Sequence, residues 1–284
     1  MNTCYEWEAT VLDHTYDFVD YVSMHQYYGN EKNDTPSFLA NTMDMDRYIN
    51  HIVSVCDYIQ AKKRSKKVLN ISFDEWNVWY HAFADNAKAE KWREKPAYNE
   101  DQYNFEDALL VGGMMITLLK HADRVKVACM AQLVNVIAPI MTENGGRIWK
   151  QTIYYPYLHA SLYGRGTALN VLVDAPKYDC KEYTDVPALE SIAVESGDGA
   201  YVTIFAMNRG EDDLEVTCCL RDYPGCRVEE FITMAGYDLK QYNTADQPDR
   251  VIPQSSSAYE MEGDCLTVTF SSYSWNVVRV RVGK

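Results

Sequence analysis

Three apolar runs within the first 165 residues each end in polar and aromatic side chains. They cover residues 18–28, 67–76 and 125–135. Apolar runs of this length are typical of strands buried in a parallel sheet. Polar side chains at the carboxyl ends of such strands are typical of the active-site rim of a (β/α)8 barrel. The pattern therefore predicts three strands of a partial barrel.

Three helices are predicted to separate and follow these strands, which gives the order β-α-β-α-β-α. Residues 46–61 carry an apolar stripe at helical spacing, formed by Ile49, Ile52, Val53, Cys56 and Ile59. Asn104 is a suitable N-cap for an apolar helix that runs to about His121. A third helix over 152–164 is expected to end at Gly164.

The pattern changes after residue 165 to short strands of alternating apolar and polar residues. The clearest are 201–208, 214–220, 265–270 and 276–282. Alternation of this kind predicts an antiparallel β-sandwich, here of jelly-roll type. The fold class is therefore α/β plus all-β, with a partial barrel over 1–165 and a sandwich over 166–284. No flexible linker separates the two, so we expect them to pack directly on each other.

Charge and cysteine usage narrow the classes of partner. The 284 residues carry a net charge of −14, which opposes binding to nucleic acid or to an anionic membrane. The basic run at 61–67 suits the carboxyl end of a helix. The most apolar stretch, 108–119, is too short to span a bilayer. Eight cysteines without a C-x-x-C pair predict free thiols in a reducing cytoplasm.

The segment SFDEWNVWYH at 72–81 places two acids among aromatic residues at the end of a predicted strand. Two carboxylates at the mouth of a barrel are typical of glycoside hydrolases. In a regular strand Asp74 and Glu75 would point to opposite sides, so only one would face the mouth. Strand parity alone does not say which one. His25, His51, His81 and the cysteines show no metal-ligand spacing.

Five segments together resemble glycoside hydrolase family 51, the α-L-arabinofuranosidases, in the order of that family. They are 19–30, 72–81, 130–139, 149–156 and 165–169. The resemblance implies barrel strands six to eight followed by the sandwich. It also implies retaining hydrolysis of terminal α-L-arabinofuranosyl residues from arabinan or arabinoxylan, without a metal or cofactor. Members are commonly hexameric, so self-association is expected, with a cytoplasmic role in arabinan catabolism.

The resemblance also implies residue roles. Glu75 would be the nucleophile at the end of strand seven, and His25 and Tyr27 match the motif that ends strand six. Trp79 would line the sugar site, and Gln132 would contact the arabinosyl ring near the end of strand eight. The chemistry agrees, because Tyr27 is suited to donate a hydrogen bond that keeps Glu75 ionised. Asp74 is expected to be structural, and Trp76 and Asn77 either shape the loop or belong to the site.

A retaining enzyme also needs a general acid/base carboxyl about 5 Å from the nucleophile. In the resembling family it belongs to strand four, which precedes the matched segments. Glu31 follows the strand-six motif at a different family position, and Glu6 and Glu8 match a helical region. The acid/base is therefore expected outside this chain, with a longer protein or a partner chain completing the barrel.

Two other functions stay open at this point. The first is another retaining glycosidase of the same barrel clan, of endoglucanase or xylosidase type. The second is an inactive carbohydrate-binding or assembly module, which the missing acid/base would explain.

Overall fold

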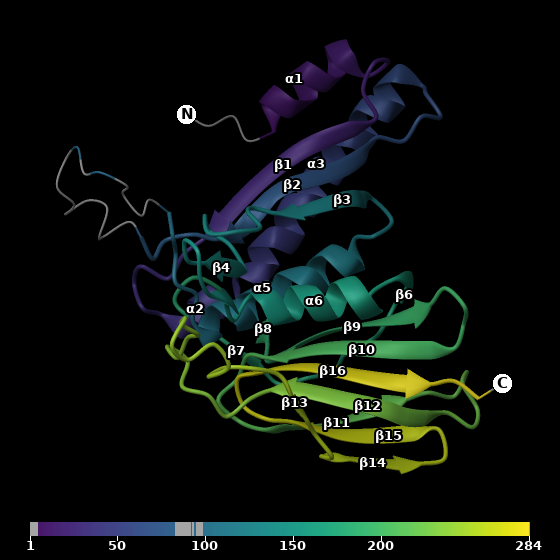
Figure 1. Ribbon diagram of the computed structural model, residues 1–284. Coiled ribbons are helices and arrows are strands. Elements are labelled where there is room, and N and C mark those ends of the chain that lie inside the picture. The colour runs from purple at the N-terminus through teal and green to yellow at the C-terminus, as the bar shows by residue number, and fades with distance from the viewer. Residues whose placement is uncertain (1–4, 83–91, 93, 95–98, 284) are drawn as a thin grey trace.

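The computed structural model describes residues 5–82, 92, 94 and 99–283. Its N-terminal part is built on a three-stranded parallel sheet in the order β1-β2-β3 (Figure 1). The strands are β1 (Tyr21–Tyr28), β2 (Asn70–Val78) and β3 (Val125–Met130). The helices of this part are α1 (Glu6–Thr15), α2 (Thr35–Leu39), α3 (Asn41–Lys63), α5 (Phe105–Lys120) and α6 (Tyr154–Tyr163). A hairpin of β4 (Ile140–Thr142) and β5 (Ile148–Lys150) precedes α6.

The predicted helices are confirmed, and local chemistry sets their ends. In the apolar stripe of α3, Ile49, Ile52, Cys56 and Ile59 are buried and Val53 is partly buried. The helix ends at Arg64, which adopts a left-handed conformation after two lysines in the last turn. Asn104 caps α5, because its side chain accepts from the backbone N–H of Asp107 at 3.1 Å and the Asp107 carboxylate accepts from the Asn104 N–H at 2.8 Å. This reciprocal capping box fixes the start of the helix.

The C-terminal part is a sandwich of two antiparallel sheets, as the alternating pattern predicted. The larger sheet has the order β13-β12-β16-β10-β9-β6 and the smaller one the order β11-β15-β14. The larger sheet holds β6 (Gly166–Leu169), β9 (Leu189–Ser196), β10 (Tyr201–Asn208), β12 (Arg227–Met234), β13 (Gln254–Ser255) and β16 (Ser274–Arg281). The smaller holds β11 (Leu214–Cys219), β14 (Tyr259–Glu262) and β15 (Cys265–Phe270), and a short ladder pairs β7 (Lys177–Tyr178) with β8 (Val186–Pro187).

Side-chain alternation decides which face of each sandwich strand is buried. Val278 and Val280 of β16 enter the core between the two sheets, whereas Arg279 lies on the other face against the rings of Tyr163 and Tyr201. Cys218 likewise packs on this core, and its neighbour Cys219 is exposed. All cysteines in the described residues are free thiols, and Cys4 lies outside those residues.

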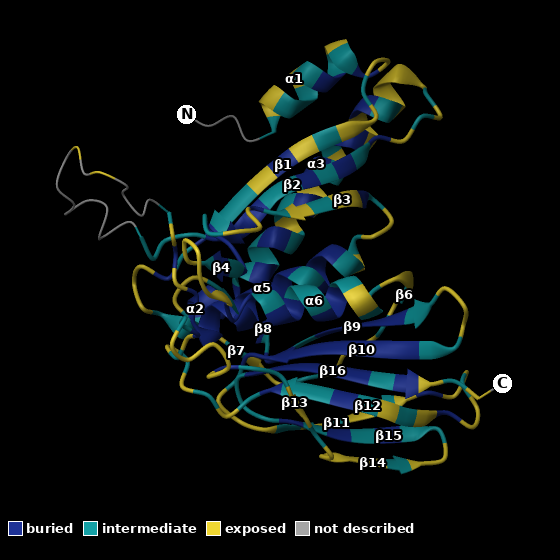
Figure 2. Ribbon diagram, viewed as in Figure 1, coloured by how far each residue is buried: buried dark blue, intermediate teal, exposed yellow. Residues whose placement is uncertain are grey.

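Helix α5 is buried almost all round because it lies between the parallel sheet and the sandwich (Figures 1 and 2). One hydrophobic cluster runs from Phe73 of β2 through α5 to Phe205 and Trp275 of the larger sandwich sheet. The approach is close, since a Cβ on Gly112 would lie 2.5 Å from the Trp275 ring. The two parts therefore share a core, and the predicted direct packing is confirmed.

This shared core contains a histidine that should make stability depend on pH. His159 is 4% exposed, and its Nδ1 accepts a hydrogen bond from Trp275 Nε1 at 3.0 Å. Burial lowers the pKa of His159 to about 4, so the unfolded chain binds the proton more readily than the folded one.

Folded-state stability should therefore fall as the pH drops from about 6.5 to 4, by about 3 kcal/mol from this group alone. A His159→Gln variant should lack this part of the pH dependence in urea unfolding measured at pH 7 and pH 4.5. Because other ionisable groups are common to both proteins, the difference between their pH profiles isolates His159. Parallel profiles would contradict the assignment.

Candidate active site

Helices α3, α5 and α6 cover one face of the parallel sheet. The opposite face is open in this chain and is called the open face below. On the open face, Tyr21, Ser23 and His25 of β1 and Val127 of β3 are exposed. Figure 2 shows exposed stretches along β1 and β3. Within the described residues, β1 and β3 each pair with β2 alone. The apolar runs predicted strands buried in a parallel sheet, and for this chain the prediction is wrong on one side, because no described element lies over the open face.

Strand β2 carries one extra residue at the position of the two acids. Ser23 pairs with Ser72 and His25 pairs with Glu75, so three steps along β2 match two steps along β1. The pairing of β2 with β3 is shifted in the same way between residues 73 and 76. An extra residue of this kind is a β-bulge, which redirects side chains and is frequent next to active sites.

The bulge brings both carboxylates to the open face. Asp74 accepts a hydrogen bond from Ser23 Oγ at 2.8 Å, and Glu75 accepts one from Tyr27 Oη at 2.9 Å. Ser23 and Tyr27 share one face of β1, because they are an even number of residues apart. The expectation that the two acids point to opposite sides is therefore wrong, since it assumed a regular strand.

The residues on either side of the acids face the helices. Phe73 packs edge-on against Tyr48 of α3, with ring centroids 6.2 Å apart. Trp76 is fully buried and stacks on Tyr157 of α6 at 6.3 Å. These two large side chains anchor the bulge from below and hold the acidic pair above it.

Glu75 lies at the carboxyl end of β2 with two partners from β1. The hydrogen bond predicted from Tyr27 is present, and His25 Nδ1 lies 3.6 Å from Glu75 Oε2. Burial, together with the hydrogen bond to Glu75, raises the pKa of Tyr27 far above its usual value. Tyr27 therefore stays protonated and remains a donor to the carboxylate.

Asp74 is held as a carboxylate. Burial by itself would raise its pKa, but hydrogen bonds from Ser23 and from backbone N–H groups, together with His25, hold the pKa below its ordinary value. A group that stays ionised cannot serve as a proton donor, so Asp74 does not supply the general acid.

Trp79 and Gln132 lie at the same edge of the sheet as Glu75. Trp79 follows β2 directly, and its ring meets the Tyr27 ring edge to face at 5.2 Å. Gln132 follows β3 by two residues and is exposed. Because carboxyl ends of parallel strands share one edge, all the predicted site residues gather there: Glu75, His25, Tyr27, Trp79 and Gln132.

Asn77 fixes the segment that carries Gln132. Its buried amide donates to the carbonyl oxygens of Ala131 at 2.8 Å and Ile137 at 2.7 Å, and to the Tyr103 hydroxyl at 3.2 Å. Asn77 thus ties the end of β2 to both ends of the Gln132 loop. Between the two open interpretations of Asn77, these contacts favour loop shaping.

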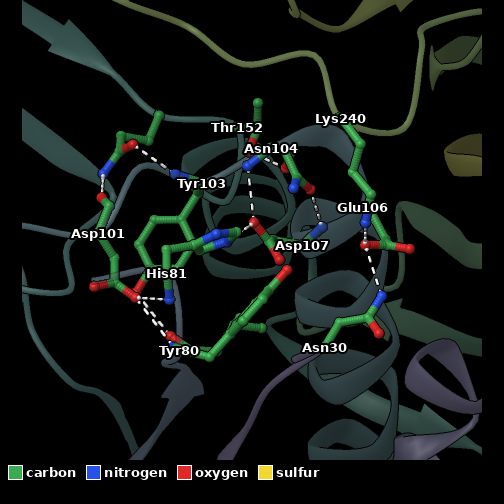
Figure 3. Close-up of polar contacts among 12 residues, drawn as sticks. Asn30, Tyr80, His81, Asp101, Tyr103, Asn104, Glu106, Asp107, Thr152 and Lys240 are labelled. Carbon is green, nitrogen blue, oxygen red and sulfur yellow. Dashed lines mark hydrogen bonds and ion pairs between the residues drawn. The ribbon is translucent and has the colours of Figure 1, made fainter. Parts of the chain in front are cut away.

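A polar network supports the residues that follow Trp79 in the sequence (Figure 3). The Asp101 carboxylate accepts the backbone N–H groups of Tyr80, His81 and Ala82 at 3.0–3.2 Å. His81 Nε2 lies 2.7 Å from the Asp107 carboxylate at the start of α5. The contacts of Asp101 and His81 were not predicted from the sequence, although the spacing of Asn104 and Asp107 is a signal of a capping box.

A second part of the network reaches the sandwich. Glu106 has no exposed surface and accepts hydrogen bonds from Asn30 and Lys240 (Figure 3). It also accepts one from the Thr35 hydroxyl. Its backbone N–H and that of Phe105 bond to carbonyl oxygens next to Lys240. The loops that frame the site are therefore fixed to both parts of the molecule.

Two cavities in the described part of the chain lie away from Glu75. A cavity of about 540 Å³ lies between α2 and the sandwich, and one of about 220 Å³ lies beside Tyr27 and Glu31. Glu75 lines neither, since it stands on the open face. Among the described residues, no group of three or more His, Cys, Asp or Glu side chains is arranged to hold a metal ion. In that same part, no helix has the length and apolar character needed to cross a membrane.

Comparison with known proteins shows the family to which this chain belongs. Residues 74–274 match the family model for the alpha-L-arabinofuranosidase C-terminal domain. The chain belongs to the family 51 α-L-arabinofuranosidases. It is 50% identical over 281 residues to an intracellular exo-alpha-(1->5)-L-arabinofuranosidase from Bacillus subtilis, covering 99% of this chain and 56% of that protein. The chain thus spans little more than half the length of such relatives.

Other family members agree in sequence and in structure. An exo-alpha-(1->6)-L-arabinofuranosidase from Bifidobacterium longum is 39% identical over 293 residues, covering 99% of this chain and 56% of that protein. A solved family 51 arabinofuranosidase from Bifidobacterium longum superposes with a TM-score of 0.90 at 34% identity, covering 100% of this chain and 57% of that one. These matches confirm the partial barrel and sandwich of the arabinofuranosidase family.

Proposed function

We propose that this chain supplies the nucleophile side of a retaining, exo-acting α-L-arabinofuranosidase. The observation that carries the proposal is the position of Glu75 at the carboxyl end of β2, where its carboxylate accepts a hydrogen bond from Tyr27 at 2.9 Å. In a barrel enzyme this edge of the sheet is where catalysis takes place. The family membership of the chain supports the same assignment.

The chemistry proceeds in two displacements. Glu75 attacks the anomeric carbon while the bond to the leaving oxygen breaks, and an acid carboxyl gives that oxygen its proton. Water, deprotonated by the same group, then attacks the arabinosyl-enzyme and releases Glu75 as a carboxylate. His25, Trp79 and Gln132 would hold the sugar, because an indole offers an apolar wall and an amide offers both a donor and an acceptor.

The acid/base would come from the portion of the enzyme that this chain does not span. That portion would also cover the open face and pair with the free edges of β1 and β3, which would otherwise invite aggregation. A longer protein or a partner chain would supply it. Self-association into hexamers, as is common in family 51, is part of the proposal for the complete enzyme.

The proposed substrates are arabinan-type and arabinoxylan-type glycans with terminal α-L-arabinofuranosyl groups. Several relatives carry the words exo-alpha-(1->5)-L-arabinofuranosidase in their names. Relatives are also named intracellular, which fits a cytoplasmic role on oligosaccharides released by arabinan breakdown. The proposed reaction on these substrates involves no metal and no cofactor.

A panel of activated aryl glycosides tests this function. Release from the α-L-arabinofuranoside, with little from the β-xyloside or β-glucoside, is the expected result. An activated leaving group needs little help from an acid, so the first displacement should be visible without the acid/base. Preference for the xyloside or glucoside would favour another barrel glycosidase. Binding of arabino-oligosaccharides without any turnover would favour a carbohydrate-binding module.

A further inference from the structure

His25 lies between the two carboxylates of the bulge, with one ring nitrogen toward Glu75 and the other toward Asp74 and Ser23. Its Nδ1 is 3.6 Å from Glu75 Oε2, and its Nε2 is 3.8 Å from Asp74 Oδ1. Ser23 Oγ lies 3.3 Å from Nε2 and donates to Asp74 at 2.8 Å. Nε2 is therefore within hydrogen-bond distance of Ser23, whereas Nδ1 faces Glu75 from beyond that distance, and a neutral ring carries only one N–H proton.

The hydrogen bonds of Ser23 determine which ring nitrogen of His25 carries the proton. The Ser23 hydroxyl has one hydrogen, and the shorter contact gives it to the charged oxygen of Asp74. Toward His25, Ser23 Oγ can then act only as an acceptor. The 3.3 Å contact is a hydrogen bond only if Nε2 carries the proton. Asp74, which stays ionised, thus reaches the ring through the serine.

We propose that Asp74 and Ser23 are positioning residues that fix the Nε2–H tautomer of His25 and leave Nδ1 bare toward Glu75. The Ser23 hydroxyl, which accepts from Nε2 and donates to Asp74, forms a relay that holds the single ring proton on Nε2. Glu75 is then hydrogen-bonded by Tyr27 but not by a neutral His25. This explains why the bulge keeps both acids on one face when only one of them is the nucleophile.

The consequence for catalysis rests on the proposed function. A hydrogen bond from Nδ1–H would stabilise the Glu75 anion and make it a weaker nucleophile. Keeping Nδ1 bare leaves Glu75 more reactive. Losing this arrangement should lower kcat for the first displacement by about tenfold, the effect of one hydrogen bond to a charged group.

The decisive measurement is the ¹⁵N spectrum of the His25 ring in the full 284-residue chain. At about pH 9, where free histidine is neutral, the two nitrogens report which one is protonated. The wild type is expected to show the Nε2–H form, with the His25 signals identified by their loss in His25→Gln. In Asp74→Ala the hydroxyl of Ser23 is free to donate to Nε2, so the proton should move to Nδ1.

Matched variants separate this role from a merely structural one. Ser23→Ala should raise the Nδ1–H population, whereas Ser23→Thr keeps the hydroxyl and should retain the wild-type spectrum. Asp20→Asn removes a carboxylate that pairs with Lys67 outside the site, and it should change nothing at His25. An unchanged His25 tautomer in both Asp74→Ala and Ser23→Ala would overturn the proposal.

The spectrum needs no turnover, so it judges the relay independently of the proposed function. A tautomer shift in a chain that never cleaves an arabinofuranoside would support the relay and count against the function. A tautomer shift with kcat unchanged would overturn the catalytic consequence. A tautomer shift together with a lowered kcat is the expected result.

Discussion

Glu75→Gln should lower release from an activated aryl α-L-arabinofuranoside by at least about 10³-fold, because the covalent intermediate can no longer form. The amide has nearly the shape of the carboxylate but carries no charge to attack the anomeric carbon. The Tyr27 hydroxyl can still donate to the amide oxygen, so the fold around the bulge should be preserved. The measurement is the initial rate of aryl release at matched protein concentration, with circular dichroism to check folding.

Glu31→Gln is the matched control for this prediction. The substitution makes the same change of charge and shape as Glu75→Gln. Glu31 lies in the loop after β1 and is not expected to take part in the chemistry. Its rate should stay within about twofold of the wild type. Equal losses in the two variants would remove Glu75 from the nucleophile role, as would undiminished release by Glu75→Gln.

Arg209→Met should destabilise the chain by about 3–5 kcal/mol, the usual cost of removing one partner from a buried ion pair. The Arg209 side chain has no exposed surface and pairs with Glu190 of β9. It also donates to the Leu39 carbonyl oxygen at 3.0 Å and to Thr42 Oγ1 at 2.9 Å. These contacts join the sandwich to the helices of the partial barrel.

The loss should be visible as a lower midpoint of urea unfolding. Adding Glu190→Met to Arg209→Met should recover part of the lost stability, because the buried Glu190 carboxylate then no longer lacks the guanidinium. The recovery is incomplete because Lys120, which also pairs with Glu190, loses its partner. Arg227→Met is the exposed control, since Arg227 only approaches Glu229 at 4.0 Å, and it should change stability by less than about 0.5 kcal/mol. A similar midpoint for both arginine variants would contradict the role given to Arg209.

The sequence was informative wherever a local rule governs the structure. Periodicity placed α3, because a helix must turn its apolar stripe to the core, and Asn104 placed the start of α5 through its cap. Alternation in β16 assigned Val278 and Arg279 to opposite faces. The motif at 72–81 pointed to the edge of the sheet where the structure gathers the site residues.

The sequence was misleading where two neighbouring strands decide the outcome together. Whether Asp74 and Glu75 face the same side depends on the pairing of β2 with both β1 and β3, and single-strand parity cannot register an extra residue. Asn77 and Asp101 bond to segments that lie 19 or more residues away along the chain. Nothing in their own surroundings in the sequence marks these partners.

The sequence by itself determined the family, the three barrel units, the sandwich and the residue proposed as nucleophile, because each depends on short-range pattern or motif. The tertiary structure alone decided that a bulge turns both acids to the open face, and that His25 stands between them. It also decided that α5 is buried by the sandwich as well as by the parallel sheet. These features arise from contacts between distant segments, whose register and packing are fixed only when the chain has folded.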